Sequence, residues 1–306
     1  MTSSENRPNK SEHNSKQTEA LEIRSRSILL CPDNDSEARM ILKLAEKARV
    51  AIVRSEQPHG ANLNLEPGIE EKLLKLKKSE VWIVETPGIE KEQELEKQGL
   101  TVKIIDHHTY QNLNRLVDLK TGKKKPSSLE QFLAMAKIDD EEMRSWGFEP
   151  KTVRGIGIMD AKYVQGLREA GYTKEEINRV FKLKKEIIEE IRPEFNKLLK
   201  LAEKEWENRR EQSGYLIISS QHGGDMRTAI SELSIIHDMD TIPMIISTGN
   251  GEKISVQNVP PEVIEKLNQS IKGNTYTFGS GRCWGVNNKN SEVKVTLEEI
   301  IQALKS

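Results

Sequence analysis

The sequence predicts an α/β protein in which a parallel-sheet domain is joined by a long helical connector to a smaller mixed α/β domain. Three observations predict it. Short apolar runs alternate with helically spaced segments over 27–106, a highly charged helical stretch covers 173–212, and strands and helices mix over 214–304. A chain of 306 residues is long enough for two domains of ordinary size.

The first region is predicted to consist of strands separated by helices. Strands are expected at 27–31, 49–54, 80–87 (running into a turn) and 100–106, with helices at 36–48, 68–78 and 90–99. Strands that alternate with helices of about this length indicate right-handed βαβ units, which build a parallel sheet. We expect this domain to cover residues 25–165.

A further strand is expected at 115–119, followed by a helix whose N-cap is Ser127 or Ser128. The charged stretch over 173–212 begins with a capping box formed by Thr173 and Glu176 and should be split at Pro193. We interpret residues 166–212 as the connector between the domains, because the apolar positions do not keep a strict heptad.

The C-terminal domain is expected to span 213–306 and to mix strands with helices. Strands are predicted at 214–220, 241–248 and 252–258, helices at 224–237, 261–270 and near 297–304, and a glycine-rich loop at 278–285. Such a mixture over one short region indicates a second α/β unit.

Composition excludes some functions and favours a compartment. Lys plus Arg number 47 against 48 for Asp plus Glu, so nucleic acid could bind only at a local basic patch. Two cysteines, Cys31 and Cys283, do not make a disulfide framework and favour a reduced, cytoplasmic protein. Without a long apolar run we expect no membrane span. Residues 1–24 lack an apolar core, so we expect a disordered tail and no secretory signal.

Acids and imidazoles follow the predicted strands. They are Asp33, Asp35, Glu85, Asp106, His107 and His108. One alone is more often a turn or cap residue, or a solvated histidine. Together they should meet at the carboxyl edge of one parallel sheet, where ligands bind. Carboxylates suit Mn²⁺ or Mg²⁺, and two such ions roughly 3.5–4 Å apart clamp a phosphoryl group, so this edge favours phosphate chemistry.

Four short motifs carry a resemblance to a known family. "PDND", "VETP", "IIDHH" and "GIMDAKY", in this order, resemble the motifs of the DHH phosphoesterase superfamily. The superfamily includes RecJ-type exonucleases, nanoRNases, cyclic-dinucleotide phosphodiesterases and family II pyrophosphatases. "SSLEQF" resembles the serine-rich helix start that follows the DHH strand, and "DMRTAISE" and "FGSGRCWG" resemble parts of the DHH-associated C-terminal domain.

The resemblance implies a role for each matching residue. Up to two Mn²⁺ or Mg²⁺ ions would be bound by Asp33, Asp35, Glu85, His107 and Asp160. His108 would contact the scissile phosphate, and Asp106 would orient its neighbours. Arg227 and the backbone amides of Gly279 to Gly281 would hold the other end of the substrate. Beside this loop, Arg282 can bind phosphate, and Trp284 either stacks on a base or is a core residue.

The chain also departs from the family pattern. Leu29 or Cys31 stands where a histidine ligand is expected, and a thiolate suits Mn²⁺ or Mg²⁺ poorly. Glu85 replaces an aspartate, and Arg282 stands where the glycine-rich loop generally ends in histidine. These departures weaken the first metal position and leave the second intact.

Two functions from different classes follow. The first is a metal-dependent phosphoesterase that hydrolyses a small nucleotide or a short single-stranded oligonucleotide. A family II pyrophosphatase is less favoured, because the C-terminal domain lacks the basic motif of that group. The second is a catalytically impaired DHH paralogue that binds nucleic acid or a protein partner. A homodimer is left open as the oligomeric state.

Overall fold

The computed structural model describes residues 10–305 apart from 56, 58–59 and 111–112, and the chain packs as two compact units. The first unit spans Met1–Ile191 and the second spans Arg192–Ser306. The division falls next to Pro193, whose ring cannot continue a helix. The connector expected over 166–212 is therefore shared, because α8 (Lys174–Ile191) belongs to the first unit and α9 (Phe195–Glu207) to the second.

The first unit contains the predicted parallel sheet. Its strands are β1 (Ser27–Pro32), β2 (Ala51–Ser55), β3 (Glu80–Val84) and β4 (Thr101–Ile105), in the order β2-β1-β3-β4. Every neighbouring pair is parallel. The carboxyl ends of all these strands consequently lie at one edge of the sheet.

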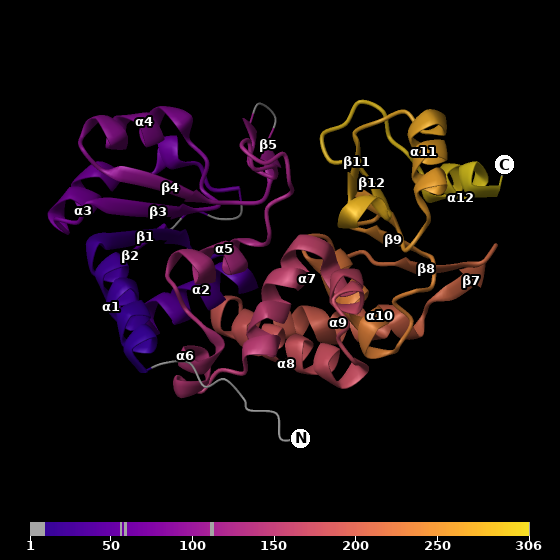
Figure 1. Ribbon diagram of the computed structural model, residues 1–306. Coiled ribbons are helices and arrows are strands. Elements are labelled where there is room, and N and C mark those ends of the chain that lie inside the picture. Colours follow the sequence, from indigo (N-terminus) through magenta and orange to yellow (C-terminus); the bar gives the residue numbers. More distant parts are fainter. Residues whose placement is uncertain (1–9, 56, 58–59, 111–112, 306) are drawn as a thin grey trace, which may run out of the picture. The chain divides into compact units, whose positions relative to one another are not determined.

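Helices cover both faces of this sheet. On one face lie η1 (Leu63–Leu65), α3 (Ile69–Lys75) and α4 (Ile89–Lys97), and on the other lie α2 (Ser36–Lys47) and α5 (Ser128–Met135) (Figure 1). Alternate residues of β1, Ile28 and Leu30, pack into the cluster under α3 and α4. The opposite face carries Trp82, whose ring meets Phe132 of α5 edge-on with the centroids 6.1 Å apart. Because side chains alternate along a strand, Leu29 and Cys31 belong to this second face.

The segment after β4 differs from the prediction. A small antiparallel pair, β5 (Thr109–Tyr110) and β6 (Leu113–Asn114), follows at once. The strand expected at 115–119 is reduced to one bridge, Val117 to Lys124. Then come α6 (Asp140–Ser145), α7 (Pro150–Glu169) and α8, and the capping box at the start of α8 is confirmed by reciprocal hydrogen bonds between Thr173 and Glu176.

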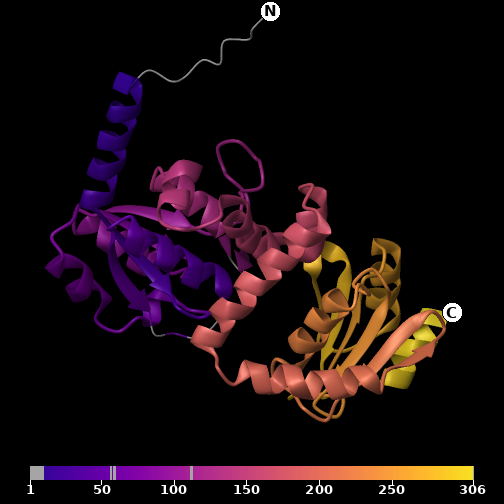
Figure 2. The ribbon, with the colours of Figure 1, turned by 90° about the horizontal axis from the view of Figure 1, so that it is seen from below.

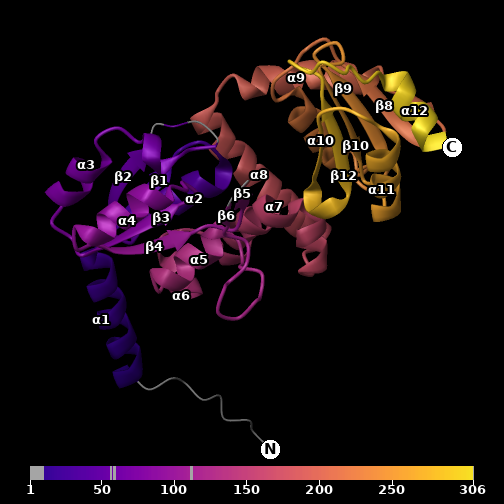
Figure 3. The same ribbon diagram turned by 90° about the horizontal axis from the view of Figure 1, so that it is seen from above.

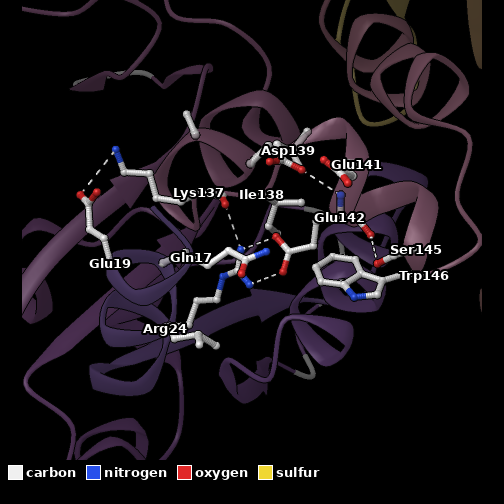
Figure 4. Close-up of a pocket in the computed structure, with 14 residues that line it drawn as sticks. Gln17, Glu19, Arg24, Lys137, Ile138, Asp139, Glu141, Glu142, Ser145 and Trp146 are labelled. Atoms are coloured by element: carbon white, nitrogen blue, oxygen red, sulfur yellow. Dashed lines mark hydrogen bonds and ion pairs between the residues drawn. The ribbon is translucent and has the colours of Figure 1, made fainter. Parts of the chain in front are cut away.

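The prediction of a disordered tail is wrong for residues 10–24, because α1 (Lys10–Arg26) runs directly into β1; residues 1–9 lie outside the described part of the chain. In Figures 2 and 3 α1 extends away from the sheet. Its C-terminal end is fixed by the buried Arg24, which donates to the Ala136 and Lys137 carbonyls and to both carboxylate oxygens of Glu142. Figure 4 shows this contact in a cavity of about 740 Å³ between α1, α5 and α6. The low apolar content of this segment led to the wrong prediction, because α1 is held by one buried guanidinium, that of Arg24, rather than by an apolar face.

The second unit holds a mixed sheet. Its strands are β7 (Arg210–Gln212), β8 (Tyr215–Ser219), β9 (Met244–Thr248), β10 (Lys253–Gln257), β11 (Thr275–Phe278) and β12 (Cys283–Asn287). The order is β11-β12-β10-β9-β8-β7, and only β8 and β9 pair in parallel among the described strands of this sheet (Figure 3). The predicted mixed α/β unit is confirmed.

Helices also cover both faces of the mixed sheet. One face carries α11 (Pro261–Ser270) and α12 (Leu297–Lys305), and α9 packs with α10 (Met226–Ile236) on the other (Figure 1). Trp284 of β12 is fully buried in the core beneath α11 and α12, among residues such as Ile264 and Ile300. Across the described residues, no helix has both the length and the apolar character needed to cross a membrane.

Candidate metal centre

The carboxyl edge of the parallel sheet gathers most of the predicted donors. Asp33 and Asp35 follow β1, Glu85 follows β3, and His107 is the second residue after β4. Asp160 reaches the same place from α7 rather than from a strand. The edge therefore brings together residues that are far apart in the sequence, as the parallel topology requires.

Four of these side chains form a close group. One ligand atom from each of Glu85, His107, His108 and Asp160 lies within 4.8 Å of the other three. His107 Nε2 lies 3.1 Å from Asp160 Oδ2 and 3.6 Å from Glu85 Oε1. We call Glu85, His107, His108 and Asp160 the four-donor group. Its spacing is short enough for the members to share a single cation.

Burial gives this group unusual protonation behaviour. Burial, together with the charges of Asp160 and Asp35, raises the pKa of Glu85 to about 8. Burial and the charge of Asp35 raise the pKa of Asp160 to about 6. Burial and the positive charge of His108 lower the pKa of His107 to about 4, which keeps its imidazole neutral. A divalent metal needs a neutral imidazole and ionised carboxylates, so an ion bound here would displace the proton that the raised pKa keeps on Glu85.

The two histidines differ in exposure and in partners. The His107 side chain is 5% exposed, whereas that of His108 is 40% exposed. His108 Nδ1 lies 3.2 Å from Asp106 Oδ1, and this hydrogen bond raises the pKa of His108 to about 9 against the opposing effect of burial. A buried neutral imidazole suits a ligand, and a half-exposed cationic one suits an anion. The geometry thus fits the different roles predicted for the two residues.

Asp106 is buried behind the histidines. Its carboxylate accepts hydrogen bonds from the His108 backbone N–H at 2.9 Å and from the Tyr110 hydroxyl at 2.9 Å. Burial opposes ionisation, but the hydrogen bonds from His108 and Tyr110 prevail and lower the pKa of Asp106. An ionised carboxylate in this position fixes the orientation of His108. Tyr110 was missed in the sequence, although it lies only four residues after Asp106.

Glu85 adopts a strained backbone conformation. Its φ of 44° lies in the left-handed region, which non-glycine residues seldom occupy. The Glu85 N–H donates to the Ile105 carbonyl at 3.0 Å, so the adjacent strand holds the turn in place. One carboxylate oxygen, Oε1, is buried and has no hydrogen-bond partner among the described residues. Strain and an unsatisfied buried oxygen in one residue are typical of a functional position.

The two aspartates after β1 are used differently. Asp35 is the N-cap of α2, where Oδ1 accepts from the Ala38 N–H at 2.9 Å, and its charge reaches Glu85 and Asp160. Asp33 Oδ2 instead accepts hydrogen bonds from Arg39 and Arg54. Neither aspartate belongs to the four-donor group. Their predicted roles as metal ligands stay predictions.

The positions expected to hold a histidine ligand are occupied by apolar packing. Leu29 and Cys31 are both fully buried. The Cys31 thiol lies against the Ala38 carbonyl, and burial raises its pKa well above the ordinary value. A thiol that resists ionisation is a poor ligand for a hard cation.

The sequence interpretation also missed Glu37. This residue of α2 is fully buried, and its Oε1 accepts a hydrogen bond from the Leu129 N–H at 2.8 Å. Burial and the charges of Asp160 and Glu85 raise its pKa well above the ordinary value. A glutamate on the apolar stripe of an amphipathic helix, four residues before Ile41, was the signal that could have identified it.

The predicted substrate residues of the second unit lie around the loop after β11. Gly279 and Gly281 have φ values of 59° and 79°, and a Cβ at Gly279 would lie 2.9 Å from the Cys283 sulfur, so glycine is required there. The Arg227 guanidinium of α10 lies over the Phe278 ring, 4.6 Å from its centroid. Arg282 is exposed directly after the loop. Their predicted roles in substrate binding stay predictions.

Stacking of a base on Trp284 is wrong for this structure. The side chain is fully buried, and its Nε1 donates to Asn268 Oδ1 at 2.9 Å. Its indole is held in the core by packing and by this bond, so no face is open to a ligand. The core alternative, which the sequence left open, is the one observed.

Comparison with known proteins gives distant structural matches only. No family model matches the chain, and no curated protein matches it. Among solved structures, RecJ with Mn²⁺ from Thermus thermophilus is similar at 12% identity and a TM-score of 0.45, over 98% of this chain and 54% of that one. The chain thus spans about half the length of that protein.

Two further structures match over most of their own length. A DHH domain described as a member of a family of ribosomal proteins has 13% identity and a TM-score of 0.47, over 97% of this chain and 90% of that one. A pGpG-specific phosphodiesterase from Vibrio cholerae has 9% identity and a TM-score of 0.45, over 91% of this chain and 96% of that one. At these identities and scores the function must be argued from the residues of this chain.

Proposed function

We propose that this chain is a member of the DHH phosphoesterase superfamily that hydrolyses a phosphate ester with the help of a divalent metal. The observation that carries the proposal is the four-donor group, in which Glu85, His107, His108 and Asp160 bring their ligand atoms within 4.8 Å of one another. His107 is buried, and so is Glu85 Oε1, which has no hydrogen-bond partner among the described residues. A cation would relieve the unfavourable proximity of the two carboxylates.

The donor set fits Mn²⁺ or Mg²⁺. Glu85 and Asp160 offer oxygen, His107 offers a neutral imidazole nitrogen, and Asp35 lies near enough to raise the pKa of both carboxyls. Carboxylates suit both Mn²⁺ and Mg²⁺, and Mn²⁺ belongs to the first-row transition metals, the class of ions that imidazole also binds. A divalent ion bound there would withdraw electron density from a phosphoryl oxygen.

The remaining residues would position the substrate. His108 is half-exposed and cationic near neutral pH, so its imidazolium can hold a phosphoryl oxygen beside the four-donor group. Asp106 keeps that ring in place through the hydrogen bond to Nδ1. His108 and Asp106 therefore carry the catalytic and positioning roles that the motif assigns to them.

We propose a small nucleotide or a short single-stranded oligonucleotide as the substrate. Arg227 and the exposed Arg282 offer guanidinium groups for phosphate, and the left-handed backbone of Gly279 and Gly281 exposes amides that suit an anion. The residue limits of the two domains, the homodimer and the cytoplasmic location stay predictions.

The second candidate is a catalytically impaired paralogue that binds nucleic acid or a protein partner. The pairing of Asp33 with Arg39 and Arg54 favours it, because an expected ligand is already neutralised. The fully buried Leu29 and Cys31 favour it also, because they replace the expected histidine. The intact four-donor group favours the enzyme.

Metal content and a hydrolysis panel test the proposal together. The purified protein is dialysed against Mn²⁺, its bound metal is measured, and it is assayed on bis(p-nitrophenyl) phosphate, pAp, di- to pentanucleotides, cyclic dinucleotides and single-stranded DNA. We expect bound Mn²⁺ and hydrolysis of at least one nucleotide substrate. Asp160→Asn should lose both, whereas Asp118→Asn, which changes a partly exposed loop acid away from the four-donor group, should keep both. Nucleic-acid binding without bound metal and without hydrolysis would establish the paralogue instead.

A further inference from the structure

Asp33 is held by two arginines from different elements. Arg39 of α2 donates from Nη1 to Asp33 Oδ2 at 2.8 Å, and Arg54 of β2 donates from Nη1 to the same oxygen at 3.1 Å. Asp33 and Arg39 are about one-fifth exposed, and Arg54 is 43% exposed. A carboxylate oxygen that accepts from two guanidinium groups already has the charge compensation that a metal would give it.

Both arginines are also ion-paired with acids other than Asp33. Arg54 Nη2 pairs with Glu46 of α2, and Arg39 Nε lies 3.8 Å from Glu190 of α8. Lys43 Nζ, one turn along α2, lies 2.6 Å from Glu190. We call Asp33, Arg39 and Arg54, with these anchoring residues, the arginine cluster. Its three cations and three carboxylates balance without any added ion.

The four-donor group has no such balance. The carboxylates of Glu85 and Asp160 lie in one group whose ligand atoms are within 4.8 Å of one another, and Asp35 and the buried Glu37 add negative charge beside them. His108 is the cationic member of the group, and Lys184 adds a positive charge that acts on Asp160. The four-donor group therefore needs an added cation to balance its acids, and the arginine cluster does not.

Among the described residues of β1, the place beside Asp33 also lacks the nitrogen ligand that the family resemblance expects for a second ion. Asp33 Oδ1 is buried without a hydrogen bond, so one oxygen remains there. The neighbouring positions on β1 that could have supplied a nitrogen hold Leu29 and Cys31, both fully buried. An ion at Oδ1 would also face two guanidinium groups bound to the other oxygen of the same carboxylate, and like charges repel at that range.

We propose that the centre takes one divalent ion at the four-donor group and that the Arg39–Arg54 pair replaces a second ion. The inference rests on the proposed metal-dependent function and fixes the stoichiometry and the cation chemistry of that site. A guanidinium in this place contributes positive charge and N–H donors that match phosphate oxygens. The partly exposed Arg54 is the member of the pair that a substrate phosphate can reach.

Metal stoichiometry tests the replacement directly. The wild-type protein is saturated with Mn²⁺, and bound ions are counted by elemental analysis and by native mass spectrometry. We expect one ion per chain. In Arg39→Gln/Arg54→Gln the freed Asp33 should admit a second, weaker ion, so the count should rise toward two at high Mn²⁺. Lys43→Gln is the matched control: it removes a cation bound to Glu190 but not to Asp33, and the count should stay at one.

The outcomes separate the two proposals. Two ions of comparable affinity in the wild type would overturn the replacement and leave the phosphoesterase proposal standing, whereas no bound ion would overturn both. A double variant that still binds one ion would show that the arginines do not exclude the second. Electron paramagnetic resonance of the saturated wild-type protein needs no variant: an isolated Mn²⁺ spectrum supports the proposal, and a spin-coupled pair overturns it.

Discussion

Two neighbouring regions on one edge of the sheet differ in how the charge of their carboxylates is compensated. In the four-donor group, the carboxyls of Glu85 and Asp160 lie close together and their pKa values are raised. In the arginine cluster, Asp33 is compensated by Arg39 and Arg54. The difference teaches that an acid at a strand end is not in itself a metal ligand. What distinguishes the two regions is whether the fold already supplies the cation.

The largest expected effect is on the four-donor side. His107→Ala removes a buried neutral imidazole, so Mn²⁺ affinity and hydrolysis should each fall by more than about 100-fold, since losing even an outer-shell partner costs 10–100-fold. His222→Ala, in the second unit, should leave both unchanged. Isothermal titration with Mn²⁺ and the rate on the best substrate measure the change. An unaltered Mn²⁺ affinity would show that His107 is not a ligand, and the proposed difference between the four-donor group and the arginine cluster would fail.

A smaller loss of activity is expected at Asp106, which lies behind the four-donor group. Asp106→Asn keeps the shape but weakens the hold on His108, so the rate should fall by about 10–100-fold while most of the metal remains bound. Steady-state kinetics and metal analysis on the same sample separate the two effects. If the metal is lost in parallel with the rate, Asp106 acts on the ligands themselves rather than on His108.

Removing the metal should make stability depend on pH. The pKa values of Glu85 and His108 are raised to about 8 and about 9, so between pH 6.5 and 8 the folded metal-free protein binds more protons than the unfolded chain. Its stability therefore falls as pH rises over this window. Mn²⁺ favours ionised Glu85 and should add about 2.7 kcal/mol at 100 times its Kd.

Melting temperatures in EDTA and in Mn²⁺ at pH 6.5 and pH 8 check this expectation. The difference between the two samples should widen toward pH 8. A constant difference would mean that ion binding does not compete with protons at Glu85.

The smallest effect is expected from a change in β1, next to the arginine cluster. Cys31→His restores an imidazole at a position where the family resemblance expects one, but Arg39 and Arg54 still neutralise Asp33. The number of tightly bound ions should stay at one, with at most a weak second ion at millimolar Mn²⁺, as titration calorimetry would measure. A tight second ion in this variant would show that a missing ligand, and not the arginine pair, separates the two regions.

Local pattern predicted the parallel sheet and the edge on which the donors lie. Alternation of strands and helices indicated the topology, and Asp106, His107 and His108 were placed because they follow a strand. The helical break at Pro193 also followed from local chemistry.

Contacts between distant segments could not be predicted in the same way. Arg54 meets Asp33 because β2 lies beside β1, and Arg24 anchors α1 because the end of α5 is near. Trp284 was open between a binding role and the core until the packing of α11 and α12 was known. Each miss concerns a partner that is set by tertiary structure rather than by the neighbouring sequence.

The left-handed backbone of Glu85 has a consequence for laboratory evolution. A non-glycine residue in this conformation costs on the order of 1–3 kcal/mol, and its buried carboxyl adds to that cost when no cation is present. A glycine at this position would remove both the backbone strain and the cost of the buried carboxyl. Selection for heat resistance in the presence of a chelator should therefore enrich replacements at residue 85. The selected variants would have a higher melting temperature but would not bind the ion, which is the usual trade-off between stability and activity at a strained site. Selecting in the presence of Mn²⁺ should keep the glutamate, because the same residue then contributes binding energy.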